Sequence, residues 1–131
     1  MYLLDTNTCS YIFRKHPSSL ARRFEQAGPG EIGLSTIVLA ELHYGAARLP
    51  NADHLRAYIQ EFAGGLTVVG WGAAAAEHYG EIRALLERAG APLGSMDLMI
   101  AAHARSLDAV LVTNNQKHFR RVPGLKLENW I

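Results

Sequence analysis

Four short, mostly apolar runs, each too short for a helix, alternate along this chain with segments of helical periodicity. They cover residues 2–4, 32–34, 66–69 and 109–112, and a turn at Pro123-Gly124 leads into a last short strand or sheet edge at residues 125–127. Strands joined by helical crossovers pair in parallel, because a parallel connection must return to the same end of the sheet. We therefore expect an α/β fold, with a central, mostly parallel, twisted sheet flanked by helices on both faces.

The composition is that of one globular domain over residues 1–131. The chain is 49% apolar and 19% charged, and its 13 basic and 12 acidic residues leave a net charge of +1. Overall charge therefore gives no case for binding nucleic acid or membrane. Cys9 is the only cysteine, which excludes an internal disulfide and fits a reducing compartment. Without a signal-peptide pattern or a membrane-length apolar run, we expect a soluble, cytoplasmic protein.

Three acids lie beside apolar stretches. Asp5 follows the first strand directly, Glu41 falls within the apolar stripe of a helix over residues 37–48, and Asp97 opens the helix that contains Ile100. Ionised acids in such places are costly unless a basic side chain or a divalent cation relieves them. No lysine or arginine lies within the apolar stripes, and hard cations such as Mg²⁺ bind carboxylates well. The pattern therefore favours a metal site, although Asp5 by itself is equally well explained as a helix cap.

Basic residues gather at two places near these acids. Lys117, Arg120 and Arg121 follow the fourth strand, and Arg14 and Lys15 end the first helix. They have two interpretations, as contacts to the phosphates of a nucleic acid or as a solvated basic face. Other chemistries find less support in the sequence. The six histidines have no paired ligand spacing such as H-E-x-x-H, so we expect most of them to be surface or packing residues.

Four ordered motifs make the sequence recognisable. They are LLDTN at residues 3–7, IVLAELHYG at 37–45, DLMIAAHA at 97–104 and VTNN at 112–115, followed by Phe119. Together they resemble the motifs of PIN-domain nucleases, most closely the VapC-type toxins of bacterial toxin–antitoxin pairs. The resemblance extends from residue 2 to residue 130.

This resemblance implies a PIN-like fold and a Mg²⁺- or Mn²⁺-dependent endoribonuclease that leaves a 5′-phosphate and a 3′-hydroxyl. It also implies a toxin that inhibits translation when free, a homodimer, and a small antitoxin that inhibits the nuclease. The antitoxin would carry a DNA-binding domain, so operator DNA would be reached only through it.

The resemblance also assigns roles to individual residues. Asp5, Glu41 and Asp97 correspond to the acids of the family, with Asp5 and Asp97 as the expected metal ligands and Glu41 as a catalytic acid. The remaining site positions are the supports Thr6, Asn7 and Thr113 and the catalytic residue Asn115. Many family members have an acid in the fourth motif, where this chain has Asn114 and Asn115. Amide oxygens can bind a hard cation but add no negative charge, so a second tightly held ion is not expected from them.

Two further functions are compatible with the same residues. The first is a PIN-fold binding module that acts with a DNA-binding partner in transcriptional regulation, its acids contacting the partner. The second is an α/β phosphohydrolase for small phosphate esters, which would turn over a chromogenic ester and leave RNA uncut. Metal-dependent cleavage of RNA distinguishes the nuclease from both.

Overall fold

A five-stranded parallel sheet forms the centre of the structure, a computed structural model that describes residues 1–131 and every side chain except that of Pro29. The strands are β1 (Tyr2–Leu4), β2 (Ile32–Ser35), β3 (Thr67–Val69), β4 (Val110–Val112) and β5 (Lys126–Glu128). The helices are α1 (Thr6–Arg14), α2 (Ser18–Ala27), α3 (Thr36–Ala47), α4 (Asp53–Gly64), α5 (Ala73–Arg88), α6 (Ser95–Ser106) and α7 (Gln116–Phe119), with a 3₁₀ turn η1 (Pro29–Glu31).

The strand order across the sheet is β3-β2-β1-β4-β5, and every neighbouring pair is parallel. β1 is the central strand, with Leu3 opposite Gly33 of β2 on one side and Leu111 of β4 on the other. Chain order moves outward from β1 to β3 and then crosses to β4 on the far side of β1. The direction of winding thus reverses between β1 and β4.

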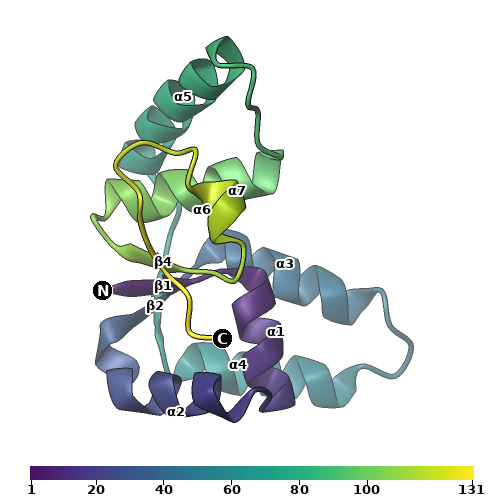
Figure 1. The fold of residues 1–131 in the computed structure, drawn as a ribbon. Coiled ribbons are helices and arrows are strands. Elements are labelled where there is room, and N and C mark those ends of the chain that lie inside the picture. Colours follow the sequence, from purple (N-terminus) through teal and green to yellow (C-terminus); the bar gives the residue numbers. More distant parts are fainter.

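Helices cover both faces of the sheet, as the sequence predicts. In Figure 1, α1, α2 and α4 lie on one side of the strands, and α5, α6 and α7 lie on the other. α5 packs mainly along α6 and extends away from the sheet (Figure 1). The expectation of a parallel sheet between two helical layers is confirmed.

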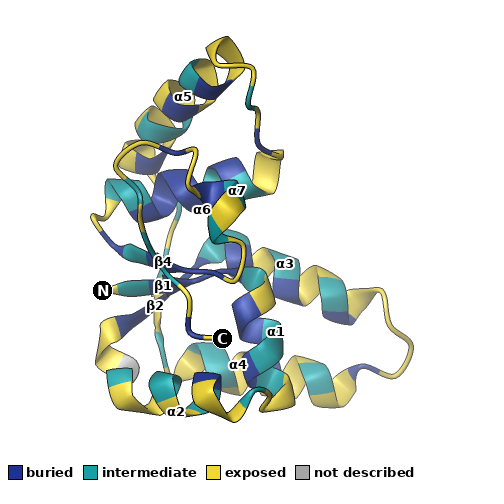
Figure 2. Ribbon diagram, viewed as in Figure 1, coloured by how far each residue is buried: buried dark blue, intermediate teal, exposed yellow. Residues whose placement is uncertain are grey.

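The core lies where the central strands meet the helices. Leu3, Leu4 and Leu111 of the central strands are buried, as are Val38 on α3 and Ile82 on α5. Figure 2 shows this as dark blue on the strands and on the inward sides of the helices, with exposed residues outside. β3, at one edge, is the exception: it is apolar at Val68 and Val69, yet Thr67 and Val68 are exposed. An edge strand has a neighbour on one side only, so it is less covered.

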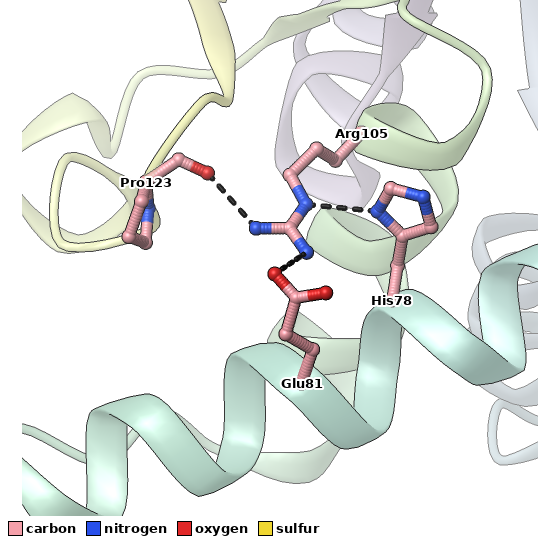
Figure 3. Close-up of polar contacts among 4 residues, drawn as sticks. All are labelled: His78, Glu81, Arg105 and Pro123. Atoms are coloured by element: carbon pink, nitrogen blue, oxygen red, sulfur yellow. Dashed lines mark hydrogen bonds and ion pairs between the residues drawn. The ribbon is translucent and has the colours of Figure 1, made fainter.

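One partly buried arginine joins elements that are far apart in the sequence (Figure 3). Arg105 on α6 donates from Nε to Nδ1 of His78 at 2.8 Å and from Nη2 to Oε1 of Glu81 at 3.0 Å, both on α5. Its Nη1 donates to the carbonyl oxygen of Pro123, before β5, at 3.1 Å. The side chain of Arg105 is only 13% exposed, and all three branches of the guanidinium are used. This contact fixes α5 and the turn before β5 to α6.

The predicted elements agree with the observed ones to within a few residues. The sequence did not predict α7, a four-residue helix after β4, and it placed the last strand one residue too early. Across the described part of the chain, no helix is both long and apolar enough to cross a membrane.

Candidate active site

The reversal in winding between β1 and β4 marks the place where an open α/β sheet has a crevice at the carboxyl ends of its strands. Asp5 follows β1 at this edge, and Thr113 to Asn115 follow β4. The backbone holds the two strand ends together, since the amide of Asp5 donates to the carbonyl of Val112 at 3.1 Å. Asp5, Asn7, Tyr11, Asn114 and Asn115 line a cavity of about 260 Å³ here.

Asp5 serves as a helix cap and also faces this cavity. Its backbone is extended, and its Oδ1 accepts a hydrogen bond from the amide of Thr8 at 2.8 Å, which caps α1. The residue is 6% exposed, so its carboxyl group is held in one place by the fold. Nearby, burial raises the pKa of the Cys9 thiol far above its usual range, and the negative charge of Asp5 raises it further. The two interpretations of Asp5 are therefore compatible, since capping uses only one of its oxygens.

Glu41 reaches back toward the first helix, as its position in the apolar stripe suggested. α3 begins at an N-cap formed by Ser35, whose Oγ accepts from the amide of Ile37 at 3.1 Å. Almost two turns later, Oε1 of Glu41 accepts a hydrogen bond from Oγ1 of Thr6 at 2.5 Å. Thr6, the residue after Asp5, is thus in direct contact with Glu41.

Glu41 also lines a larger groove, of about 610 Å³, between α1, α3 and α4. Asn7 borders this groove as well as the cavity beside Asp5, so the two hollows adjoin at that residue. Arg14 and Arg48 also line it. Arg48 was not among the residues predicted from the sequence, although its position seven residues after Glu41 places it on the same helix face, two turns on.

Asp97 is not among the described residues that line either hollow. It lies in the first turn of α6, partly exposed, and its Oδ2 accepts a hydrogen bond from Nε2 of His118 at 2.9 Å. The sequence motifs assign His118 no role, and its spacing is that expected of a surface or packing histidine. Its place three residues after Asn115, just beyond a strand end, was the available signal.

The fourth motif shapes the loop between β4 and α7. Thr113 is fully buried, and its Oγ1 accepts from the backbone amide of Asn115 at 2.9 Å. Asn115 then begins α7, its carbonyl accepting from the amides of His118 and Phe119. Thr113 thus contacts the backbone of Asn115, and Asn115 borders the same cavity as Asp5.

The predicted basic residues differ in their surroundings. All five are exposed, and only Arg14 lines the groove that contains Glu41. Its guanidinium lies over the ring of Tyr11, 5.4 Å from the centroid. Arg121 donates to the carbonyl of Pro92 at 3.1 Å, which commits one of its nitrogens.

The donor set of this site suits a hard cation. Among the side chains described, neither Asp5 nor Glu41 forms an ion pair with a basic residue, and Asp97 pairs only with His118. The three acids do not form a preassembled cluster, since no three His, Cys, Asp or Glu side chains in the described part of the chain are grouped to hold a metal. Mg²⁺ typically binds one or two carboxylates and keeps several waters, so it does not require such a cluster.

Known proteins resemble this chain over almost its whole length. Ribonuclease VapC2 of Rickettsia felis is 42% identical over 131 residues, which covers 99% of this chain and 98% of that protein. The tRNA(fMet)-specific endonuclease VapC of Shigella flexneri is 42% identical over 129 residues, covering 98% and 97%.

Solved structures agree with these relatives. DNA-bound VapBC from Salmonella typhimurium superposes with a TM-score of 0.94 at 39% identity, covering 99% of this chain and 98% of that one. VapBC2 from Rickettsia felis, bound to a DNA fragment from its promoter, gives 0.92 at 40% identity with the same coverage. The family model described as PIN domain matches residues 2–125. PIN-domain nucleases generally use divalent metal ions. The resemblance predicted from the four motifs is thus confirmed, and the chain belongs to the VapC ribonucleases of the PIN-domain family.

Proposed function

We propose that this chain is an endoribonuclease that hydrolyses phosphodiester bonds in RNA and acts as the toxin of a toxin–antitoxin pair, inhibiting translation when free of its antitoxin. One observation carries the proposal. Relatives named ribonuclease or endonuclease VapC are about 40% identical to this chain from end to end. The fold and the acids at the sheet edge are consistent with that activity. The regulatory binding module without nuclease activity is not favoured, because these relatives are named as nucleases.

In this proposal Asp5 and Asp97 hold Mg²⁺ or Mn²⁺, and Glu41 and Asn115 complete the catalytic site. Such an ion lowers the pKa of bound water and neutralises charge that develops on a phosphate. Support comes from the carboxylate donors and from the absence of lysine or arginine partners for Asp5 and Glu41 among the described residues. The protein's own part is to keep these groups in place. Asp5 is held by the amide of Thr8, and Glu41 is held by the hydroxyl of Thr6.

RNA would approach along the groove beside Glu41, with its phosphates near exposed basic residues. Arg14 is the best supported of these, because it lines the groove that contains Glu41. Further phosphate contacts in this proposal are Lys15, Lys117, Arg120 and Arg121. Arg121 is the weakest of these, because its Nη1 already donates to the carbonyl of Pro92. Removing any one of these contacts would make RNA binding less dependent on salt concentration.

The partner in this proposal is a small antitoxin with a DNA-binding domain, and operator DNA is bound only through it. Support comes from three of the solved relatives that are VapBC complexes, two of which are bound to DNA. We further propose that residues 1–131 act as a single domain, that the protein forms a homodimer, and that it works in the cytoplasm. The buried free thiol of Cys9 fits that reducing compartment.

The test is cleavage of cellular RNA by the chain purified free of any partner. Wild type, Asp97→Asn and the control Asp53→Asn are incubated with Mg²⁺ or Mn²⁺, and in parallel with a chelator. Asp53 is an exposed acid on α4 whose one ion pair among the described side chains is with Arg56, so its variant controls for the loss of one surface charge.

We expect wild type and Asp53→Asn to cut RNA only with the metal ion, and Asp97→Asn to be folded and inactive. No cutting by the folded, metal-loaded wild type would refute the nuclease. Equal cutting by Asp97→Asn would refute the proposed site while keeping the activity.

A further inference from the structure

His118 is the one histidine that contacts a candidate metal ligand among the residues described. Its Nε2 lies 2.9 Å from Oδ2 of Asp97. A carboxylate can only accept a hydrogen bond, so Nε2 must carry the proton and donate it. The contact joins two elements that are 21 residues apart in sequence, the first turn of α6 and the one-turn helix α7.

The backbone around His118 is fixed from both sides. After it, Phe119 is 2% exposed and anchors α7 in the core. Before it, the carbonyl of Asn115 accepts from the amides of His118 and Phe119 at 3.1 and 3.2 Å. The amide of Asn115 in turn donates to the buried hydroxyl of Thr113. The imidazole is therefore presented to Asp97 by a rigid turn, so the hydrogen bond can hold the carboxylate at little entropic cost.

This hydrogen bond uses one oxygen of Asp97 and leaves the other available. Among the described side chains, Oδ2 has His118 as its partner and Oδ1 has no hydrogen-bond partner. Outside donors that fix a ligating side chain generally strengthen metal binding, because the ligand needs no reorganisation when the ion arrives. Asp97 needs such help more than Asp5, which is buried and capped, because Asp97 is partly exposed.

We propose that His118 is a positioning residue of the metal site: it donates from Nε2 to Oδ2 of Asp97 and fixes that carboxylate with Oδ1 available to a divalent cation. This proposal rests on the proposed function, in which Asp97 is a ligand of the metal ion. His118 thereby restricts the orientation of the Asp97 carboxylate. This matters in a site whose fourth motif contributes amides, where an acid would add negative charge. The imidazole acts through Asp97 and is not itself a ligand.

The proposal is tested by ion binding, which does not depend on catalysis. Free Mn²⁺ is measured by its electron paramagnetic resonance signal during titration of wild type, His118→Leu, His118→Gln and His54→Leu. Leucine removes the donor, whereas the amide nitrogen of glutamine can donate from a similar distance. His54 is an exposed histidine on α4 and serves as the matched control. Circular dichroism and urea unfolding confirm that each variant is folded.

We expect His118→Leu to weaken Mn²⁺ binding about tenfold, at the lower end of the range known for donors to metal ligands. His118→Gln should stay within about threefold of wild type, and His54→Leu should not change binding. In RNA cleavage, His118→Leu should need more Mn²⁺ for half-maximal rate and recover most of kcat at saturating ion.

Three results would overturn the proposal. They are unchanged Mn²⁺ affinity in His118→Leu, His118→Gln as weak as His118→Leu, and a wild type that binds no Mn²⁺. The second result would mean that the ring itself is a ligand. A wild type that binds Mn²⁺ through His118-supported Asp97 but cuts no RNA would refute the nuclease and leave the positioning role standing.

Discussion

The hydrogen bond from Thr6 to Glu41 gives the sharpest prediction about how the site is built. Thr6→Val keeps the branched shape and a similar helix propensity but removes the hydroxyl that lies 2.5 Å from Oε1 of Glu41. Hydrogen bonds to charged groups contribute about 1.5–3 kcal/mol when buried. Thr6 and Glu41 are both partly exposed, so we expect the free energy of unfolding to fall by only about 1 kcal/mol.

The effect on activity should be larger than the effect on stability. Without the hydroxyl, Glu41 can adopt other rotamers, and losing such a supporting contact typically costs about 10- to 100-fold. We therefore expect kcat/KM for metal-dependent RNA cleavage to fall at least about tenfold. Ser10→Ala is the matched control, because Ser10 lines the same groove and, among the described residues, its hydroxyl donates to the carbonyl of Thr6 alone.

A double-mutant cycle with Glu41→Gln decides whether the contact is the cause. Urea unfolding and cleavage assays are carried out on wild type, both single variants and the double variant. If the hydroxyl acts through the Glu41 carboxylate, Thr6→Val should lower the free energy of unfolding and kcat/KM much less in the Glu41→Gln background than in wild type. Equal cost in both backgrounds would refute it, since the hydroxyl would then act on something other than the Glu41 carboxylate.

Three further predictions concern other parts of the molecule. Burial lowers the pKa of His103, partly opposed by a hydrogen bond to the Gly70 backbone, so the folded protein keeps this ring neutral. Its contribution to stability is present above about pH 6.5 and is lost as pH falls, by up to about 1.4 kcal/mol per unit, because the unfolded state takes up the proton. Urea unfolding at several pH values should show a smaller loss in His103→Gln, and an equal loss would contradict this. The buried thiol of Cys9, whose pKa is raised, should react with a disulfide reagent only upon denaturation, and rapid reaction of the native protein would disprove its burial. Arg105→Met should lower the free energy of unfolding by about 1–2 kcal/mol, mostly from the loss of the hydrogen bonds to His78 and to the carbonyl of Pro123, because Glu81 is well exposed. RNA cleavage by that variant should be unchanged, and stability equal to wild type would show that the three contacts contribute nothing.

Much of the fold could be predicted because burial leaves a periodic trace in the sequence. The short apolar runs at β1, β2 and β4 indicate strands, and the segments between them have helical spacing. Asp5 was a candidate site residue because it follows the first strand, and Glu41 because it interrupts an apolar stripe. Edge strands were harder: β3 and β5 were located to within a residue, but their exposure depends on their place at the two ends of the sheet.

The sequence by itself determined most of the strands and helices, the mostly parallel sheet, and the position of Asp5 directly after the first strand. Only the tertiary structure decided that β1 and β4 are neighbours, which brings Asp5 beside Asn115, and that His118 meets Asp97. The physical reason is that periodicity reports whether a residue is covered, not what covers it. His118 lies in a polar stretch with Lys117 and Arg120, and such a stretch looks the same whether its histidine faces water or a carboxylate.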